Sequence, residues 1–457
     1  MEEKIKEFIF SHKDEIVKDL AELVAIPSVL GEPEKGAPFG REPRRALSAM
    51  ESICKNMGFE TSVIGSAVLC ADFGGEPELG VLAHLDVVPA LEDNWGTDPF
   101  TLTEKNGALF GRGAIDDKGP AVAALWALNA VKSLGIPLKK GVRLIFGTDE
   151  ENGFKDLEIY KESEKFPPKV FTPDGSFPVI NVEKGMLGVK FKGIVGGNAL
   201  EFRGGNIPNA VPDKAKAILR KATADRVNNA IVPPAEDDTD APKFAVSERG
   251  NGVLIACSGR AAHSSTPEMG VNAVTAAVEL LAKLMGEDIL IGLARLFPFG
   301  ETDGAALGLQ CADESGALTC VLSTLAIAPG GEMEGTIDIR FPTCTSVNAV
   351  ESKLRAALQG LKIECETIIG KEPHVVPEDS ELVKRLLAVY ERVEGEKGRC
   401  IAIGGGTYVH NIEGGVAFGA ERGDTDYHMH GANEFITVDE LLNDAVLFAN
   451  AVIEICG

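Results

Sequence analysis

The hydrophobic pattern alternates between helical and strand-like periods over the first 186 residues of the chain. Apolar residues recur at helical spacing over residues 2–24 and 44–57, and the stretch 121–134 is rich in Ala and Leu. Short apolar runs bounded by glycine lie between these segments and predict buried strands. Because predicted strands and helices alternate, this part of the chain is expected to form an α/β domain.

Four of the predicted strands end in a histidine or in acidic side chains. The apolar runs 81–83, 113–115, 142–146 and 169–171 precede, in that order, His84 with Asp86, Asp116 with Asp117, Asp149 with Glu150 and Glu151, and Asp174. Ligands and catalytic groups of open α/β sheets gather at the carboxyl ends of the strands. The pattern therefore predicts one pocket lined by a histidine and several carboxylates, which is the composition of a metal site.

A second type of pattern occupies the middle of the chain. Predicted strands and helices are mixed there with long connections that contain Gly and Pro, which is typical of an α+β domain. The strands are predicted at 187–194, 252–258 and 332–341, and the helices at 272–285 and 347–359. The earlier pattern resumes near residue 382 and ends with a predicted helix over 438–455. We therefore expect residues 1–186 and 375–457 to form one domain, into which residues 187–374 are inserted as a second.

The composition of the chain narrows the classes of molecule that it is expected to bind. The chain has 457 residues, of which 45 are Lys or Arg and 69 are Asp or Glu, so its formal net charge is −24. This balance argues against nucleic acid and anionic membranes, because both are bound by clustered basic residues. No long apolar run predicts a membrane span, and the charged N-terminal segment lacks the core of a signal peptide. Nine cysteines without a C-x-x-C pair are typical of buried, reduced thiols, so we expect a cytoplasmic protein.

Each of the acidic and histidine motifs is ambiguous by itself. An H-x-D sequence alone is weak, adjacent acids at a helix start can simply favour the helix dipole, and Glu150-Glu151 could be a solvated surface pair. The turn sequence P-D-G explains Asp174 equally well. In the late segment D-T-D-Y-H-M-H-G-A-N-E, either His428 or His430 could be a ligand, or neither.

Together and in this order, the motifs resemble the two-metal peptidase family of aminoacylases, carboxypeptidase G and dipeptidases. The family pattern is H-x-D, then G-R-G-x-x-D-x-K-G, then E-E, then an Asp or Glu, then a late His, and all of these parts occur here. The segment G-R-A-A-H-S-S-T-P-E-M-G-V-N-A at 259–273 is similar to the family's lid domain. The resemblance spans nearly the whole chain. It implies an α/β catalytic domain of zinc-aminopeptidase type, with a mixed sheet flanked by helices, and an inserted α+β lid domain.

The resemblance also implies the metal ligands. One ion would be bound by His84, Asp116 and Asp174, and the other by Asp116, Glu151 and His430, with Asp116 bridging the two. Asp116 matches because it stands two residues before the lysine of the motif, and His430 matches because G-A-N-E follows it. Three carboxylates and a bridging hydroxide would neutralise two divalent ions. The donors are all N or O, which suits Zn²⁺ and also admits Mn²⁺ or Co²⁺.

Proton chemistry is implied for two acids and one histidine. Paired ions can share the attacking water and lower its pKa. Glu150 would be the general base that takes the proton of this metal-bridging water and passes it to the leaving amine. Asp86 would orient His84 by accepting its second ring N–H. His263 resembles the lid histidine that stabilises the tetrahedral oxyanion, although a histidine near a helix start is ordinarily a surface residue.

Substrate contacts are implied elsewhere. Asn209 in I-P-N-A-V-P-D and Arg340 in D-I-R-F-P resemble substrate-binding positions. The guanidinium of Arg340 could bind a substrate carboxylate with two parallel hydrogen bonds. Gly404, Gly405 and Gly406 would offer backbone N–H groups to the same carboxylate, although a tight turn explains the three glycines equally well.

Three further features resemble bacterial dipeptidases of the peptidase V type, an Xaa-His or carnosinase-like group. They are A-P-F-G at 37–40, G-G-G-T-Y followed by V-A-F-G, and the large insert. The enlarged lid of these enzymes mimics a dimer partner, which implies a monomer. We therefore predict a metallopeptidase that hydrolyses dipeptides with a free N-terminus. The alternatives are an N-acyl amino acid deacylase or desuccinylase and, in another class, an inactive homologue that binds peptides.

Overall fold

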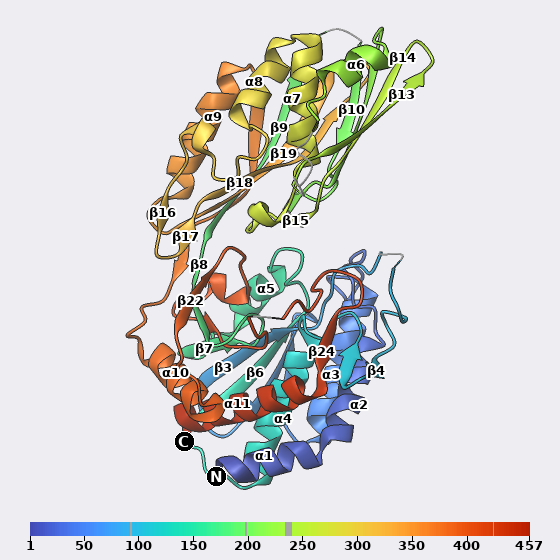
Figure 1. Ribbon diagram of the computed structural model, residues 1–457. Helices are drawn as coiled ribbons and strands as arrows, with labels where there is room; N and C mark the ends of the chain where they lie inside the picture. The colour runs from blue at the N-terminus through green and yellow to red at the C-terminus, as the bar shows by residue number, and fades with distance from the viewer. Residues whose placement is uncertain (92–93, 197–198, 234–239, 424) are drawn as a thin grey trace. The chain divides into compact units, whose positions relative to one another are not determined.

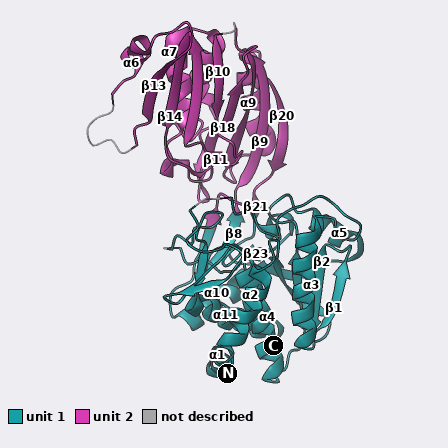
Figure 2. Cartoon of the chain, turned by 90° about the vertical axis from the view of Figure 1, so that its right-hand side faces the viewer, with its two compact units in different colours: residues 1–182, 375–401, 406–457 teal, residues 183–374, 402–405 magenta. Residues whose placement is uncertain are grey.

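The computed structural model describes residues 1–91, 94–196, 199–233, 240–423 and 425–457, and these form two compact units (Figure 1, Figure 2). Unit 1 comprises Met1–Val182, Val375–Ile401 and Gly406–Gly457. Unit 2 comprises Glu183–His374 and Ala402–Gly405. Unit 1 is therefore formed by segments from both ends of the chain, and unit 2 is mainly one long segment between them.

The sheet of unit 1 is mixed. Its strands follow the order β1-β2-β6-β3-β7-β23-β8-β21, with β22 beside β8. β3 runs parallel to β6 and β7, whereas β1 and β2 run antiparallel to their neighbours. The bounds are β1 Glu60–Ile64, β2 Val68–Phe73, β3 Pro77–His84, β6 Gly141–Gly147, β7 Lys169–Thr172, β8 Val179–Glu183, β21 His374–Val375, β22 Cys400–Ile403 and β23 Val416–Ala417.

This sheet is covered on both faces, as the continuous apolar runs of its central strands require. Val81 and Ala83 of β3 face a large core that includes α4 and α11, while Leu82 and Ile145 face a smaller core that includes α5. The helices α4 and α11 pack directly against β3 (Figure 1). The helices of unit 1 are α1 Glu2–Ser11, α2 Lys13–Val24, α3 Arg41–Asn56, α4 Lys118–Ser133, α5 Lys155–Ser163, α10 Glu381–Glu394 and α11 Val438–Cys456, with the 3₁₀ turn η3 Tyr408–Asn411.

Two predictions for unit 1 are wrong. The predicted helix over residues 2–24 is two helices, because the backbone leaves helical geometry at His12, with φ −105° and ψ 22°. The apolar run 113–115 is not a strand but part of an irregular segment that precedes α4. Gly113 has φ +86° there, far from the φ of regular strands. The strands β4 (Thr103–Lys105) and β5 (Ala108–Phe110) precede this segment in the sequence, and they form a three-stranded sheet with β24 (Phe435–Thr437).

Unit 2 is built on an antiparallel sheet with the order β13-β14-β12-β10-β18-β19-β9-β20. Leu187, Val189 and Phe191 of β9 belong to a core shared with α7 and α9, whereas Lys190 and Lys192 are exposed. The sheet elements are β9 Gly185–Ile194, β10 Leu200–Gly204, β12 Lys214–Arg220, β13 Lys243–Arg249, β14 Gly252–Ser258, β18 Thr319–Ile327, β19 Glu332–Phe341 and β20 Glu364–Lys371. The remaining elements are β11 Ala210–Val211, β15 Ala262–His263, β16 Ala312–Asp313, β17 Gly316–Ala317, α6 Ala224–Ala230, α7 Ala273–Met285, α8 Asp288–Leu296, α9 Val347–Gly360, η1 Pro267–Met269 and η2 Ala305–Leu307.

Much of unit 2 was not predicted from the sequence. Strands β10, β12, β13, β18 and β20 were missed, whereas β9, β14 and β19 were predicted close to their observed bounds. The missed strand β12, K-A-K-A-I-L-R, shows the reason, because it alternates charged and apolar residues instead of forming a continuous apolar run. A half-exposed antiparallel strand has this pattern.

The cysteines are free, but only some of them are buried. Cys54, Cys70, Cys257, Cys320 and Cys456 are buried, whereas Cys311, Cys344, Cys365 and Cys400 are partly or fully exposed, so the prediction of buried thiols is wrong for these four. Within the described ranges, no helix is long and apolar enough to cross a membrane.

Candidate active site

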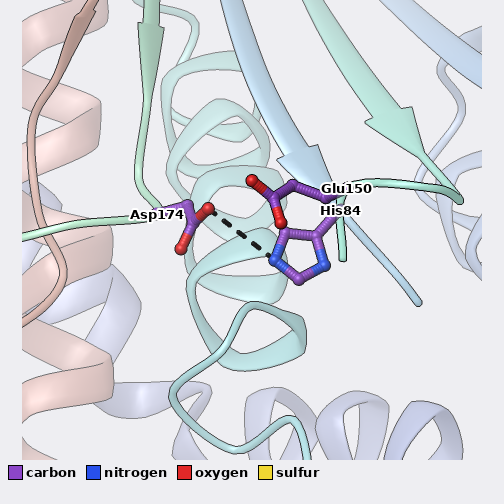
Figure 3. Close-up of side chains that lie close together, drawn as sticks. All are labelled: His84, Glu150 and Asp174. Atoms are coloured by element: carbon purple, nitrogen blue, oxygen red, sulfur yellow. Dashed lines mark ion pairs between the residues drawn. The ribbon is translucent and has the colours of Figure 1, made fainter. Parts of the chain in front are cut away.

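The carboxyl ends of three neighbouring parallel strands carry the first part of the candidate site. His84 is the last residue of β3 and lies opposite Gly147, the last residue of β6. Glu150 follows β6 and Asp174 follows β7, so the sheet brings their side chains to the same edge. Figure 3 shows the side chains of His84, Glu150 and Asp174 gathered at this edge, with His84 Nε2 3.7 Å from Asp174 Oδ2.

Asp116 and His430 complete the cluster from segments that have no regular structure. Asp116 Oδ1 lies 2.9 Å from His84 Nε2, and Asp116 Oδ2 lies 2.8 Å from His430 Nε2. The same His430 nitrogen is 3.3 Å from Glu151 Oε2. Of the two histidines that the sequence left open, His430 is therefore the one that contacts the carboxylates. The ring of His428 lies against Phe435 instead.

The donor atoms of these residues fit divalent metal ions. Ligand atoms of His84, Glu150 and Asp174 lie within 4.8 Å of one another, and so do those of His84, Asp116 and Glu151. His84 Nε2 and Glu151 Oε1 are buried without a hydrogen-bond partner among the described residues. Asp116 Oδ1 is close to His84 Nε2, but the two groups are not aligned as a hydrogen bond. Buried donors of this type, all N or O and converging on a common centre, are what Zn²⁺ and similar ions require.

The electrostatics of the cluster lead to the same conclusion. Burial, together with the charge of Asp116, raises the pKa of Glu151, and burial raises the pKa of Asp174 to about 8. Burial alone would lower the pKa of His430, but its contacts with Asp116 and Glu151 raise it to about 11. Carboxylates crowded together out of water repel one another, and a cation between them removes this cost. Without a cation, these groups relieve the repulsion by holding protons, as the raised pKa values of Asp174 and His430 indicate.

Asp86 contacts both the ring of His84 and the turn that follows β6. His84 Nδ1 lies 3.0 Å from the backbone oxygen of Asp86 and 3.6 Å from its Oδ1. A hydrogen bond from Nδ1–H to this carbonyl leaves Nε2 as the metal-binding nitrogen. The Asp86 carboxylate accepts hydrogen bonds from the backbone N–H groups of Glu150 and Glu151, at 3.2 and 3.1 Å. The aspartate of H-x-D therefore fixes the turn that carries the E-E pair.

Several residues of the site were missed in the sequence. Asp117, fully buried, accepts the backbone N–H of His84 at 3.0 Å, and Glu434, also fully buried, accepts backbone N–H groups around Asp116. Glu421 accepts a hydrogen bond from Ser176 Oγ at 3.1 Å, and it is close enough to raise the pKa of Asp174. Nothing in the sequence separates these acids from solvated ones, because their partners are backbone groups and residues distant in the chain.

Within unit 2, most of the predicted substrate residues are brought together. The pairing of β11 with β15 places Ala210 opposite His263, and the backbone oxygen of Asn209 accepts the N–H of Ser264 at 3.0 Å. Ser264 Oγ donates to Asp338 Oδ1 at 2.8 Å. Asn209 and His263 are therefore adjacent, and Asp338 connects their segment to the rest of this cluster.

Arg340 is the best-fixed member of the unit 2 cluster. Its Nε and Nη2 donate to the Asp338 carboxylate at 2.7 and 3.1 Å, and its Nη1 donates to the backbone oxygen of Gly404 at 3.2 Å. The carbonyl of Gly404 is thus already bound. Gly405 belongs to unit 2 and Gly406 to unit 1, and both are partly exposed.

Comparisons with known proteins identify the family. Residues 80–287 match the model of peptidase family M20/M25/M40, and residues 250–366 match a peptidase dimerisation domain. YtjP of Bacillus subtilis (strain 168), provisionally named a dipeptidase, is 33% identical over 464 residues, with 98% of each chain covered. The Beta-Ala-Xaa dipeptidase of Lactobacillus delbrueckii subsp. lactis is 30% identical over 472 residues, which cover 100% of this chain and 99% of the relative.

Among solved structures, human carnosine dipeptidase 1 has the same fold, with a TM-score of 0.64 and 18% identity over 99% of this chain and 98% of the human one. The predicted fold class, a mixed α/β domain with an inserted lid or dimerisation domain, is thereby confirmed. The predicted resemblance to metal-dependent peptidases is confirmed as well. This chain belongs to peptidase family M20/M25/M40.

Proposed function

We propose that this protein is a metal-dependent dipeptidase that hydrolyses the peptide bond of dipeptides with a free N-terminus. The observation that carries the proposal is in unit 1, where the metal-ligand cluster is accompanied by two further carboxylates, Glu150 and Glu421. The names of the relatives, among them a Beta-Ala-Xaa dipeptidase, support the same class of substrate.

Two divalent ions are proposed as cofactors. His84, Asp116 and Asp174 would hold one, and Asp116, Glu151 and His430 the other; the distances among these residues support such a pair. When bound, the ions would polarise the scissile carbonyl and lower the pKa of the attacking water. We propose Zn²⁺, because imidazole and carboxylate ligands suit it, with Mn²⁺ or Co²⁺ as alternatives.

Glu150 is proposed as the general base. Burial, together with the charge of Asp174, raises the pKa of Glu150 well above its ordinary value. A carboxylate of raised pKa can hold a proton between two steps, so Glu150 would take the proton of the attacking water and give it to the leaving amine. Asp86 would keep Glu150 in place through the hydrogen bond to its backbone N–H.

Glu421 favours a substrate with a free amino group. Burial raises the pKa of this carboxyl, and the charge of Asp116 adds to the effect. An ammonium group beside the cluster would pair with the Glu421 carboxylate. A dipeptide has such a group next to its scissile bond, whereas an N-acetyl or N-succinyl amino acid does not. The dipeptidase proposal is therefore preferred over a deacylase or desuccinylase.

Unit 2 is proposed to supply the remaining contacts. His263 would donate to the oxyanion, and Arg340 with Asn209 would bind the substrate carboxylate, with help from the backbone of Gly404–Gly406. The two-point contact of Arg340 with Asp338 supports this role, because it fixes the guanidinium plane while leaving other N–H groups for a ligand. We further propose a cytoplasmic monomer without nucleic acid or membrane partners. The net charge of −24, the free cysteines and the large insert support these points.

A substrate panel tests the proposal. The metal-loaded protein should turn over free dipeptides and leave N-acetyl and N-succinyl amino acids intact, and turnover of the acylated set alone would establish the deacylase instead.

Glu150→Gln keeps the size of the side chain but removes the base, so kcat should fall by roughly 10²–10⁴-fold while the metal content stays at the wild-type level. Unchanged turnover in this variant would refute the mechanism. Peptide binding without turnover or metal in the wild type would make the protein a binding homologue.

A further inference from the structure

Glu434 is a buried carboxylate with an unusual set of partners. Its Oε1 accepts backbone N–H groups from Gly113, Ile115 and Asp116, at 2.9, 3.2 and 3.3 Å. Its Oε2 accepts from Arg112 Nη1 at 2.7 Å. Glu434 is 0% exposed and Arg112 is 1% exposed. One side chain therefore organises the whole irregular segment that carries Asp116.

Glu434 also lies at the end of a second irregular segment. This segment carries His430, four positions before Glu434. His428, His430 and Asn433 have φ values of 55°, 60° and 63°, a left-handed conformation that costs free energy for residues with a Cβ. Such a backbone persists only where its ends are fixed. At one end Tyr427 is buried and donates to Glu440 Oε1 at 2.8 Å, and at the other end Glu434 is fully buried.

We propose that Glu434 is a positioning residue that joins the Asp116 segment to the His430 segment and thereby sets the spacing of these two ligands. The inference rests on the proposed function, in which Asp116 and His430 bind the same ion. In this role Glu434 contacts neither the substrate nor the ion. It acts through the backbone N–H of Asp116 on one side and through four residues of chain on the other.

The charge of Glu434 and its two oxygens are both necessary for this role. The three N–H groups at Oε1 and the guanidinium at Oε2 are all donors. In Glu434→Gln the amide nitrogen replaces one oxygen, so an N–H faces either the backbone donors or Arg112. In both orientations a buried donor is left opposite another donor, and Arg112 no longer faces a carboxylate at this position.

Metal affinity in the absence of substrate is the direct measurement. Metal-free Glu434→Gln would be titrated with Zn²⁺ in competition with a chromogenic chelator. We expect an affinity about 10- to 100-fold weaker than that of the wild type, the range found when partners behind metal ligands are lost. With Co²⁺ in place of Zn²⁺, the visible absorption spectrum should change, because the geometry around the ion depends on the ligand spacing.

Asp72→Asn is the matched control. Asp72 accepts from Nε and Nη2 of Arg143 at 2.8 Å each, and Arg143 lies toward the start of β6, whereas the candidate site follows the end of this strand. This variant also places an amide opposite an arginine in unit 1. Its Zn²⁺ affinity and Co²⁺ spectrum should match those of the wild type. An equal loss in both variants would show that Glu434 contributes only general stability, which overturns the proposal.

Glu434→Asp covers the case in which Glu434→Gln does not fold. The shorter carboxylate keeps its charge for Arg112 but cannot reach all three backbone donors, so metal affinity should again fall, while the retained charge pair should make this variant more stable than Glu434→Gln. Wild-type affinity in a folded Glu434→Asp or Glu434→Gln refutes the inference and leaves the dipeptidase proposal intact. A wild-type protein that binds no metal refutes the dipeptidase proposal itself.

Discussion

The proposed metal ligands of unit 1 come from two kinds of backbone, which are held in place differently. His84, Glu151 and Asp174 follow the strands β3, β6 and β7, and the parallel ladder between these strands sets their spacing. Asp116 and His430 come from irregular segments that no ladder holds. A strand end positions a ligand through the sheet, whereas an irregular segment needs side chains that bind its backbone N–H groups.

The two proposed histidine ligands also differ in burial. His84 is 0% exposed at its strand end, whereas the side chain of His430 is 49% exposed. Asp116, on the other irregular segment, is buried like His84, so the exposure is a property of the His430 segment. Removing His84 at the strand end should therefore weaken both metal binding and folding, whereas removing His430 should weaken mainly metal binding.

The largest expected effect comes from removing one histidine of each kind. His84→Ala and His430→Ala should each lower turnover at least about 100-fold, because each removes a proposed ligand. The two variants should differ in unfolding free energy in the metal-free state. His84→Ala leaves buried carboxylates without a partner and should cost about 3 kcal/mol or more, whereas His430→Ala should cost less, because its side chain is 49% exposed and water can replace it. Urea unfolding monitored by circular dichroism, with a chelator present, gives both values.

The comparison depends on the difference between these two losses. Equal losses of unfolding free energy would mean that the His430 segment is as much a part of the core as the strand end. A folded His430→Ala with wild-type turnover would remove His430 from the proposed ligands.

A smaller effect tests how tightly the strand end is packed. A Cβ added at Gly147, opposite His84, would overlap the hydroxyl of Tyr408 and the carboxylate of Asp156, which are hydrogen-bonded to each other. Gly147→Ala should therefore cost about 1–3 kcal/mol of unfolding free energy. Gly107→Ala is the control for steric overlap, since nothing lies within 4 Å of a Cβ there and its φ of +79° makes only backbone strain. A loss at Gly147 no larger than that at Gly107 would contradict the close packing.

The effect that is smallest for a single step of the experiment, one pH unit, is a pH dependence of the metal-free protein. Burial raises the pKa of Asp174 from 3.8 to about 8. Between these values the folded protein holds a proton that the unfolded chain has released, so unfolding free energy should fall as pH rises, by about 1 kcal/mol per pH unit for this group. Divalent metal should reduce the slope by replacing the proton. Unfolding curves at pH 5, 6, 7 and 8 would show it, and a rise in stability over this range would contradict the assignment.

Local pattern in the sequence predicted which acids and which histidine follow strands, and the family resemblance then selected the ligands among them. Continuous apolar runs before His84, Glu151 and Asp174 indicated buried parallel strands, and the ends of such strands meet at one edge. Asp116 was chosen through the family motif, and the strand predicted before it is wrong. The choice between His428 and His430 likewise rested on resemblance, and the structure shows His430 in contact with the carboxylates.

Unit 2 was predicted less completely for a related reason. Some of its antiparallel strands, such as β12, are half exposed, so their sequences alternate and give no continuous apolar run. Asp338 stands two residues before Arg340, on the same face of β19, yet its contacts with Arg340 and Ser264 were not foreseen. A single acid on a strand does not reveal which donors approach it from elsewhere in the chain.

The sequence by itself determined the fold class and the family and proposed the residues that would bind metal, because strand periodicity and motif order can be read along the chain. Only the tertiary structure decided what holds the irregular segments. Asp117 binds the backbone of His84, which is 33 residues away, and Glu434 binds the backbone of Asp116, which is 318 residues away. Hydrogen bonds of such long range have no periodicity in sequence. They form only after burial has removed the water that would otherwise satisfy the same donors.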